Sequence, residues 1–341
     1  MKVLVTGAAG FIGSHVVDAL CDGGASVLAV DSLDSGVFHG APDYLNPAAE
    51  YCFADLRHVD FDQRFADVEA VVHLAALGGV SRAARQPANV IGANCGGTAR
   101  LVEAMATWPK LRRVVLCSSF SVYGSNYSYR CPSCDAERDG ERRTADLEKG
   151  RFEVLCAKCG KEARVVPITE RATPNPLEIY GASKFMQELC FRGFSKAPLT
   201  ILRFSSVYGT RLRLDDGEAT IIAKIAGWIR SGTRPRIFED GRQIRDWVYV
   251  GDIVSAARAL LEMSDAPAIV NVCTGVPTTL IEACNAIAGA MHKDCPPDVV
   301  GGFRPGDMRH CLGDPTEIAR LLGRRPLPLL EGAPLAFGGP T

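Results

Sequence analysis

Three residues of this chain have side chains that could together oxidise an alcohol: Ser119, Tyr180 and Lys184. Tyr180 and Lys184 are four residues apart in "IYGASK", and residues at this spacing lie on one face of a helix. An ammonium beside a phenol stabilises the phenolate and lowers its pKa, so Tyr180 could act as a general base. Ser119, in "CSSFSVYG", could hydrogen-bond the same substrate hydroxyl. Because Tyr-x-x-x-Lys alone is common on helix surfaces, the interpretation depends on the elements around it.

A glycine-rich turn precedes these residues and is typical of a dinucleotide site. Its glycines lie between a predicted strand and a predicted helix, at Gly7, Gly10 and Gly13. They allow a tight turn, a close approach of pyrophosphate and close packing of the helix. The helix start, with Phe11 and Ile12, offers free N–H groups to phosphate. Asp31 ends the next strand, where a carboxylate can accept hydrogen bonds from both ribose hydroxyls, which favours NAD over NADP. The alternative is a plain glycine turn with a capping aspartate.

Alternating patterns predict a Rossmann-type α/β fold with a doubly wound parallel sheet. Strands are predicted near residues 3–6, 24–31, 70–76, 113–119 and 199–209, and helices at 11–20, 94–107 and 181–195. The regular alternation ends near residue 204. We therefore expect a NAD-binding domain over 1–203, interrupted by an insert at 127–166, and a smaller mixed substrate lobe over 204–341, interleaved with the first. The final residues, 329–341, read as a frayed tail.

Composition excludes several classes of partner. The formal net charge of the 341 residues is -1, which predicts no binding of nucleic acid or of an anionic membrane surface. Charged residues interrupt every apolar stretch before it reaches membrane-spanning length, and without a targeting segment the cytoplasm is expected. Nine of the 13 cysteines are scattered singly and read as reduced, buried thiols.

The other four cysteines form two C-x-x-C pairs separated by 21 residues: Cys131, Cys134, Cys156 and Cys159. Four thiolates make a closed tetrahedral site, so the pattern predicts a structural zinc ribbon without a chemical role. The alternatives are free thiols or two disulfides. Gly160 suits the turn after the second pair. Residues 127–166 carry nine Lys/Arg and eight Asp/Glu, a balance that argues against a nucleic-acid-binding ribbon.

In combination, these motifs resemble those of the extended short-chain dehydrogenases/reductases, in the branch of NAD-dependent nucleotide-sugar epimerases and dehydratases. The likeness covers nearly all of the chain except residues ~127–166. It implies that Tyr180 is the base, that Lys184 holds the nicotinamide ribose and that Ser119 polarises the hydroxyl. It also places further cofactor contacts at Asp55, Leu56, Leu74, Ala75, Ala76 and Asn94. His73, in the same strand as Leu74, reads as a core histidine.

The resemblance places substrate contacts in the second lobe. Arg245 in "GRQIRDW" and Arg304 in "FRPGDMR" are candidates for the diphosphate, since guanidinium groups bind phosphate bidentately. Arg211 and Ser206 are further candidates, and Asp246 and Asp252 are expected to hold this segment in shape. The family commonly pairs as a homodimer through helices near 94–107 and 181–195.

The residues after Ser119 favour epimerisation over dehydration. Dehydratases of this family carry Thr-Asp-Glu where this chain has Ser119, Phe120 and Ser121, and phenylalanine cannot protonate a leaving hydroxyl. We therefore expect a C4 epimerase that works through a transient 4-keto sugar. A 4,6-dehydratase-like or decarboxylating relative and a non-catalytic NAD-binding regulator remain alternatives. Ser206 and Glu178 depart from the family pattern; Glu178 reads as a helix-start acid.

Overall fold

The computed structural model describes residues 1–194, 196–214, 220–304 and 306–339. The chain divides into two compact units, each assembled from three separate segments. Unit 1 comprises Met1–Val122, Pro176–Phe204 and Val250–Val270. Unit 2 comprises Tyr123–Asn175, Ser205–Tyr249 and Asn271–Thr341. The chain therefore passes back and forth between two bodies, rather than finishing one before it starts the other.

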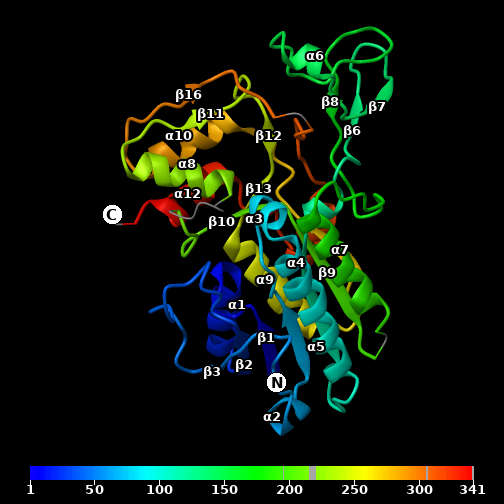
Figure 1. Ribbon diagram of the computed structural model, residues 1–341, viewed down its shortest axis with the longest axis vertical. Coiled ribbons are helices and arrows are strands. Elements are labelled where there is room, and N and C mark those ends of the chain that lie inside the picture. Colours follow the sequence, from blue (N-terminus) through cyan, green and yellow to red (C-terminus); the bar gives the residue numbers. More distant parts are fainter. Residues whose placement is uncertain (195, 215–219, 305, 340–341) are drawn as a thin grey trace. The chain divides into compact units, whose positions relative to one another are not determined.

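Unit 1 is built on a sheet that, within the described residues, has seven strands in the order β14-β9-β5-β4-β1-β2-β3 (Figure 1). The strands are β1 (Lys2–Thr6), β2 (Ser26–Asp31), β3 (Glu50–Phe53), β4 (Ala70–His73), β5 (Arg113–Ser119), β9 (Leu199–Phe204) and β14 (Ile269–Val272). All pairs from β3 to β9 are parallel. The strand order reverses between β1 and β4, which is the usual site of a dinucleotide. The predicted doubly wound α/β sheet is confirmed.

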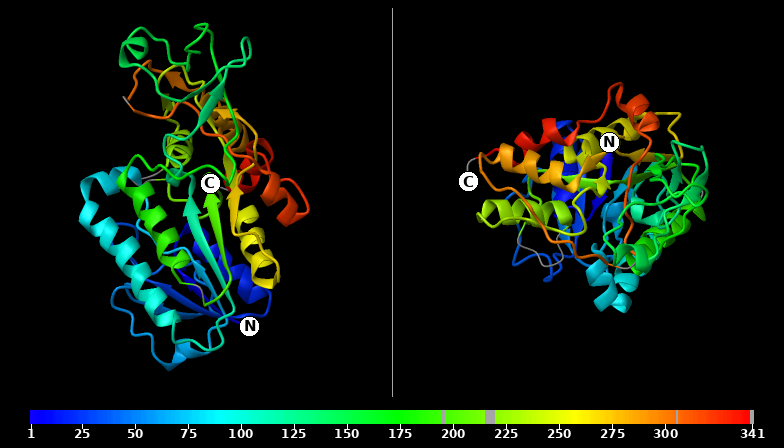
Figure 2. Two further views of the ribbon diagram at one scale, coloured as in Figure 1. Left: turned by 90° about the vertical axis from the view of Figure 1, so that its right-hand side faces the viewer. Right: turned by 90° about the horizontal axis from the view of Figure 1, so that it is seen from above.

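Helices cover both faces of this sheet, which explains why its strands are continuously apolar. They are α1 (Phe11–Asp22), α2 (Gln63–Ala66), α3 (Val80–Arg85), α4 (Pro87–Ile91), α5 (Gly97–Met105), α7 (Ile179–Arg192) and α9 (Val250–Glu262). α5 and α7 lie on one face, and α1 and α9 lie on the other (Figure 2). All four residues of β4 are buried, including His73, as expected for a strand covered on both sides.

Two local details differ from the sequence-based expectation. The strand predicted over 199–209 is broken at Ser205 into β9 and a separate strand, β10 (Ser206–Tyr208), which pairs with β13 (Trp247–Tyr249) in unit 2. A π-helical turn, Gly92–Gly96, precedes α5 and places Asn94 in the fully buried interior. Such turns often mark functional sites.

Unit 2 has a helical core beside short strands. Its helices are α8 (Ile221–Arg230), α10 (Leu280–Ala290), α11 (Thr316–Leu322) and α12 (Leu329–Phe337), and its short strands include β11 (Arg236–Ile237) with β16 (Asp298–Val299) and β12 (Ile244–Arg245) with β15 (Thr278–Thr279). α8, α10 and α12 pack around Trp247. The prediction of a frayed tail is wrong, because Leu329, Ala333 and Phe337 bury one face of α12 in this core.

The insert between β5 and α7 forms a small antiparallel sheet within unit 2. Strand β6 (Ser128–Arg130) pairs with β7 (Glu137–Asp139) and with β8 (Arg164–Val165), and the short helix α6 (Thr144–Leu147) follows β7 (Figure 1). Tyr127, Tyr129, Leu147 and Val154 are among its few buried apolar side chains. Burial on this scale supplies little stability, so other interactions must fix the insert.

In the described parts of the chain, none of the helices combines the length and the apolar character that crossing a bilayer requires. The cytoplasmic location stays a prediction from the sequence.

Candidate active site and metal centre

The glycine turn after β1 has a shape that side chains would destroy. Gly7 has a φ of +69°, and a Cβ there would lie 2.8 Å from the backbone nitrogen of Ala75. A Cβ on Gly13 would lie 2.0 Å from the carbonyl oxygen of Gly7, so only glycine lets α1 begin this close to β1. Gly10 is the N-cap of α1, whose first turn carries no acidic residue. The cradle and its free helix N-terminus fit a pyrophosphate.

Asp31 closes this turn from the end of β2. One carboxylate oxygen accepts a hydrogen bond from the backbone N–H of Ala9, the other from Leu33, each at 2.9 Å. Burial raises the pKa of Asp31, and these backbone bonds act in the opposite direction. A carboxylate offers about four acceptor positions, so these backbone bonds leave capacity for a ribose hydroxyl. The residues around Asp31 therefore fit NAD.

Asp55 and Leu56, the two residues expected beside the adenine, have different surroundings. The carboxylate of Asp55 is held by Arg57, with side-chain contacts at 3.0 Å and 2.7 Å, and this hydrogen bonding lowers the pKa of Asp55. Leu56 is buried against Gly97 at the start of α5, where an added Cβ would lie 3.2 Å from the Leu56 Cβ. Leu56 thus contributes mainly to the core, and its contact with an adenine stays a prediction.

The loop after β4 is fixed to α7 by Asn94. Leu74, Ala75 and Ala76 lie on this loop, half-buried, beside Gly7. The side-chain oxygen of Asn94 accepts from Leu77 N at 2.7 Å, and its nitrogen donates to the hydroxyl of Ser183 at 2.9 Å. Asn94 therefore joins the loop after β4 to α7, and its contact with the cofactor stays a prediction.

Tyr180 and Ser119 meet in unit 1. Tyr180 lies in the first turn of α7 and Ser119 is the last residue of β5. α7 begins close to this strand end: a Cβ on Gly181 would lie 2.5 Å from the carbonyl oxygen of Ser121. Burial raises the pKa of Tyr180 to about 12, whereas a hydrogen bond with Ser119 lowers it and the charge of Glu178 raises it. The expected lowering of the Tyr180 pKa is therefore absent, because burial outweighs the favourable contact.

Lys184, one turn further along α7, is only 3% exposed, and burial lowers its pKa to about 8. Its Nζ donates to the side-chain oxygen of Gln187 at 2.7 Å. The Gln187 nitrogen donates to Thr98 Oγ1 at 2.7 Å and lies 3.0 Å from His73 Nε2. His73 is the expected core histidine: burial lowers its pKa to about 3. Sequence reasoning missed Gln187, whose only signal is its position three residues after Lys184.

Glu178 is the N-cap of α7, as its position at the helix start suggested. Its carboxylate accepts hydrogen bonds from the backbone N–H groups of Tyr180 at 2.7 Å and Gly181 at 2.9 Å. The carboxylate is thereby committed to fixing the turn that carries Tyr180.

The candidate substrate residues Ser206, Arg211, Arg245 and Arg304 all belong to unit 2. The guanidinium of Arg245 donates to the carbonyls of Arg309 at 3.0 Å and Met308 at 3.3 Å. Arg304 is exposed, and its guanidinium lies 5.3 Å from the ring centre of Phe238. Ser206 and Arg211 are half-buried. Asp246 holds its segment in place by accepting from Thr274 N at 2.7 Å and from Gly275 N at 3.0 Å.

The four paired cysteines converge in the insert, with all four sulfurs within 4.8 Å of one another. Sγ–Sγ distances of 3.5, 3.6 and 3.6 Å are close to the ~3.8 Å edge of a tetrahedron with Zn–S bonds of about 2.3 Å.

The two C-x-x-C turns have the same geometry. Asp135 N and Gly160 N donate to the carbonyls of Cys131 and Cys156, both at 2.9 Å, from left-handed φ values of 58° and 70°. Two matching knuckles facing each other fit a tetrahedral metal ion.

This chain matches a known protein family over most of its length. Residues 3–273 match the NAD dependent epimerase/dehydratase family. The chain belongs to this family.

Curated relatives of this family member act on different nucleotide sugars. A dTDP-L-rhamnose 4-epimerase of Burkholderia thailandensis is 30% identical over 97% of this chain and 92% of its own. A UDP-glucose 4-epimerase of Mycolicibacterium smegmatis is 32% identical over 97% of this chain and 96% of its own length. The structure of Thermus thermophilus UDP-glucose 4-epimerase with NAD is 27% identical, with a TM-score of 0.74 over 99% of this chain and 98% of that chain. The predicted family is confirmed.

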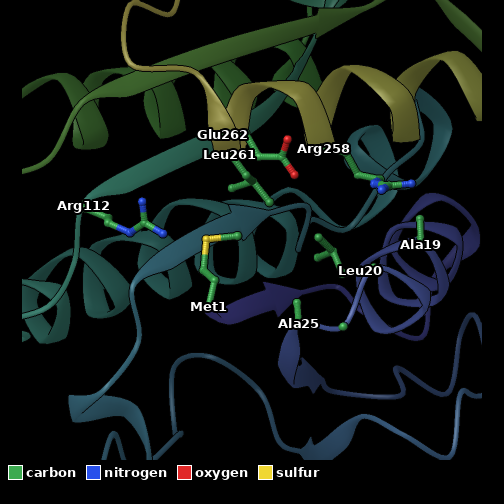
Figure 3. A pocket seen from close by; sticks show the side chains of 10 residues that line it. Met1, Ala19, Leu20, Ala25, Arg112, Arg258, Leu261 and Glu262 are labelled. Carbon is green, nitrogen blue, oxygen red and sulfur yellow. The ribbon is translucent and has the colours of Figure 1, made fainter.

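A cavity of about 390 Å³ lies elsewhere in unit 1 of this epimerase/dehydratase-family protein (Figure 3). It is lined by Met1, Arg112, Arg258, Glu262 and the turn after α1. Met1 precedes β1, so the cavity lies at the amino end of that strand. Ligands of open α/β sheets bind at the carboxyl ends. This cavity is therefore not the active site.

Proposed function

We propose that this protein is an NAD-dependent nucleotide-sugar epimerase that inverts C4 through a transient 4-keto sugar. The observation that carries the proposal is the placement of Ser119, Tyr180 and Lys184 in the same unit as the glycine cradle and Asp31. The family match and the relatives named as 4-epimerases support it.

Each catalytic side chain has a distinct task in this proposal. Tyr180 takes the proton of the C4 hydroxyl, and Ser119 hydrogen-bonds that hydroxyl. Lys184 holds the nicotinamide ribose with an ammonium oriented by Gln187. Bound NAD would accept hydride from C4, return it to the other face, and supply a cationic ring that favours the phenolate. After hydride return, Tyr180 gives its proton back, so the protein ends each turnover unchanged.

Phe120 favours epimerisation over dehydration. Its side chain is 4% exposed and lies in the short 3₁₀ turn Phe120–Val122. A buried phenyl ring supplies no proton for a leaving hydroxyl. A dehydratase-like or decarboxylating reaction would need an acid from another element, and the neighbouring Ser121 is no acid at neutral pH.

Incubation of the purified protein with UDP-glucose, UDP-glucuronic acid and dTDP-L-rhamnose tests the proposal. We expect at least one to be converted to its C4 epimer with unchanged mass, seen by NMR and mass spectrometry. Tyr180→Phe should lower kcat by about 10²–10⁴-fold, the usual contribution of a general base. Tyr51→Phe removes a phenol hydroxyl from the edge strand β3 and serves as the control. Loss of water or CO₂ from the substrate would contradict epimerisation.

We propose further that the four cysteines bind one structural zinc ion. A closed Cys₄ site leaves no position for water or substrate, so zinc would stabilise the insert and take no part in the reaction. Elemental analysis should find one zinc per chain. Cys134→Ser should lose it and loosen residues 123–175, whereas Cys21→Ser should keep it. A full zinc content in Cys134→Ser would contradict this assignment.

We also propose a homodimer that pairs through α5 and α7. Met186 and Leu189 of α7 are 46% and 43% exposed, which is unusual for large apolar side chains. Light scattering should give twice the chain mass. Met186→Glu with Leu189→Glu should give the monomer mass, because charges at the centre of an interface oppose pairing.

A further inference from the structure

A cluster of buried charges joins the cysteine insert to the rest of unit 2. At its centre is Arg309, which is fully buried. One of its terminal nitrogens lies 2.7 Å from Glu239, and the other lies 2.6 Å from Glu153 and 2.8 Å from Asp240. Glu153 comes from the insert, whereas Glu239 and Asp240 come from the segment after β11. Arg309 therefore binds three carboxylates from two distant parts of the chain.

Arg142 makes the same connection from the insert side. Its side chain is 4% exposed. One nitrogen contacts Glu239 at 2.9 Å, and the other donates to the carbonyl of Asp307 at 2.8 Å. Arg142 and Arg309 thus share Glu239 as a partner. Because an unpaired buried charge is costly, each arginine constrains where the other can lie.

The insert also contacts residues 310 and 311 directly. The second oxygen of Glu153 lies 2.9 Å from His310 Nε2, and the backbone N–H of His310 donates to the hydroxyl of Tyr129 at 3.2 Å. The hydroxyl of Tyr127 lies 2.8 Å from the sulfur of Cys311. Side chains of the insert therefore contact every residue of the stretch 307–311 except Met308.

The same stretch also contacts Arg245, a candidate phosphate ligand. Arg245 donates to the carbonyls of Met308 and Arg309, so the backbone that the insert holds also orients the Arg245 guanidinium. Arg304 lies three residues before Asp307 in the same loop. Insert, loop and arginine form one continuous series of contacts within unit 2.

We propose that the cysteine insert is a brace for the diphosphate-binding arginines, with Arg142 and Glu153 as positioning residues. They act through residues 307–310 on Arg245. This inference rests on the proposed function in one respect, because it takes Arg245 and Arg304 as ligands of a nucleoside diphosphate. It assigns the insert a role in substrate affinity that is separate from the hydride transfer carried out in unit 1.

Arg142→Met tests the brace, and Arg143→Met is its matched control, because Arg143 is adjacent but its side chain is 81% exposed. In Arg142→Met we expect faster hydrogen exchange in residues 303–311. The Kd of UDP or dTDP and the KM of the sugar nucleotide should rise about 10-fold or more. kcat at saturation should stay within about 2-fold, and zinc and NAD contents should not change. Arg143→Met should match the unaltered protein in each measurement.

A folded, zinc-loaded Arg142→Met with unaltered exchange and unaltered Kd would overturn the brace. If Arg142→Met does not fold, Glu153→Gln replaces it, because this change keeps the shape of the contact to His310 but removes its charge. Faster hydrogen exchange with a higher Kd would then support the brace, and unaltered exchange with an unaltered Kd would overturn it. Failure of the proposed function would look different. The unaltered protein would then bind neither UDP nor dTDP, which removes the phosphate role, while hydrogen exchange would still report whether the insert orders the loop.

Discussion

At the scale of single residues, the candidate catalytic side chains depend on buried partners. Gln187 is fully buried, and its side-chain oxygen accepts a hydrogen bond from the ammonium of Lys184 at 2.7 Å. Tyr180, Ser119 and Lys184 could be predicted because local spacing and nearby motifs identify them. Gln187 could not, because its other contacts, His73 and Thr98, come from elements about 90 to 115 residues away.

Gln187→Leu should change the pH dependence of kcat. Burial lowers the pKa of Lys184 to about 8, so the ammonium is present below that pH and is lost as the pH rises through it. Removing the acceptor should lower the Lys184 pKa further, because the Gln187 oxygen favours the charged form. The alkaline fall in kcat should then begin at lower pH, and kcat at pH 7 should fall about 10-fold. Gln63→Leu, at the exposed start of α2, should leave the profile unchanged. An unshifted profile in Gln187→Leu would mean that Gln187 only fills space.

At the scale of elements, the junction of β1 and α1 leaves no room for a side chain at Gly7 or Gly13. Gly13→Ala would place a methyl group 2.0 Å from the carbonyl oxygen of Gly7, so the helix must shift. We expect a loss of about 1–3 kcal/mol in the free energy of unfolding and a lower NAD content after purification. Gly289→Ala is the control: it lies inside α10 with no atom within 4 Å of the added Cβ, so stability should be unchanged or slightly higher. Retention of full NAD content in Gly13→Ala would show that the turn can adapt.

The elements themselves were largely predictable. Apolar runs and the glycine turn predicted β1, β2, β4, β5, α1 and α7 to within a few residues. The break at Ser205 was not predictable, because "LTILRFSSVYG" is uniformly strand-like and only pairing with β13 removes β10 from the main sheet. α12 was missed because its sequence contains the helix breakers Gly332 and Pro334, whereas burial of Leu329, Ala333 and Phe337 decides its structure.

At the scale of the whole molecule, acid should weaken the attachment of the insert. Burial alone would raise the pKa of Glu153, but its hydrogen bonds with His310 and Arg309 lower it to about 2. A lowered pKa contributes stability above the ordinary value of 4.5, and that contribution is lost as the pH falls from 4.5 towards 2. Urea unfolding of Glu153→Gln should therefore show a deficit of about 2 kcal/mol at pH 7 that shrinks below pH 4.5. Glu148→Gln, exposed in the same insert, should show none. A deficit in the free energy of unfolding that does not change with pH would show that the loss comes from packing and not from the charge of Glu153.

The strand order of the main sheet also has a consequence for synthesis. β14, one outer strand, is residues 269–272, and the helix α9 that covers β5 ends at Glu262. A chain leaving the ribosome therefore cannot complete its nucleotide-binding body until about four-fifths of it has been translated. The whole cysteine insert emerges before that point, while the main sheet still lacks its outer strand β14.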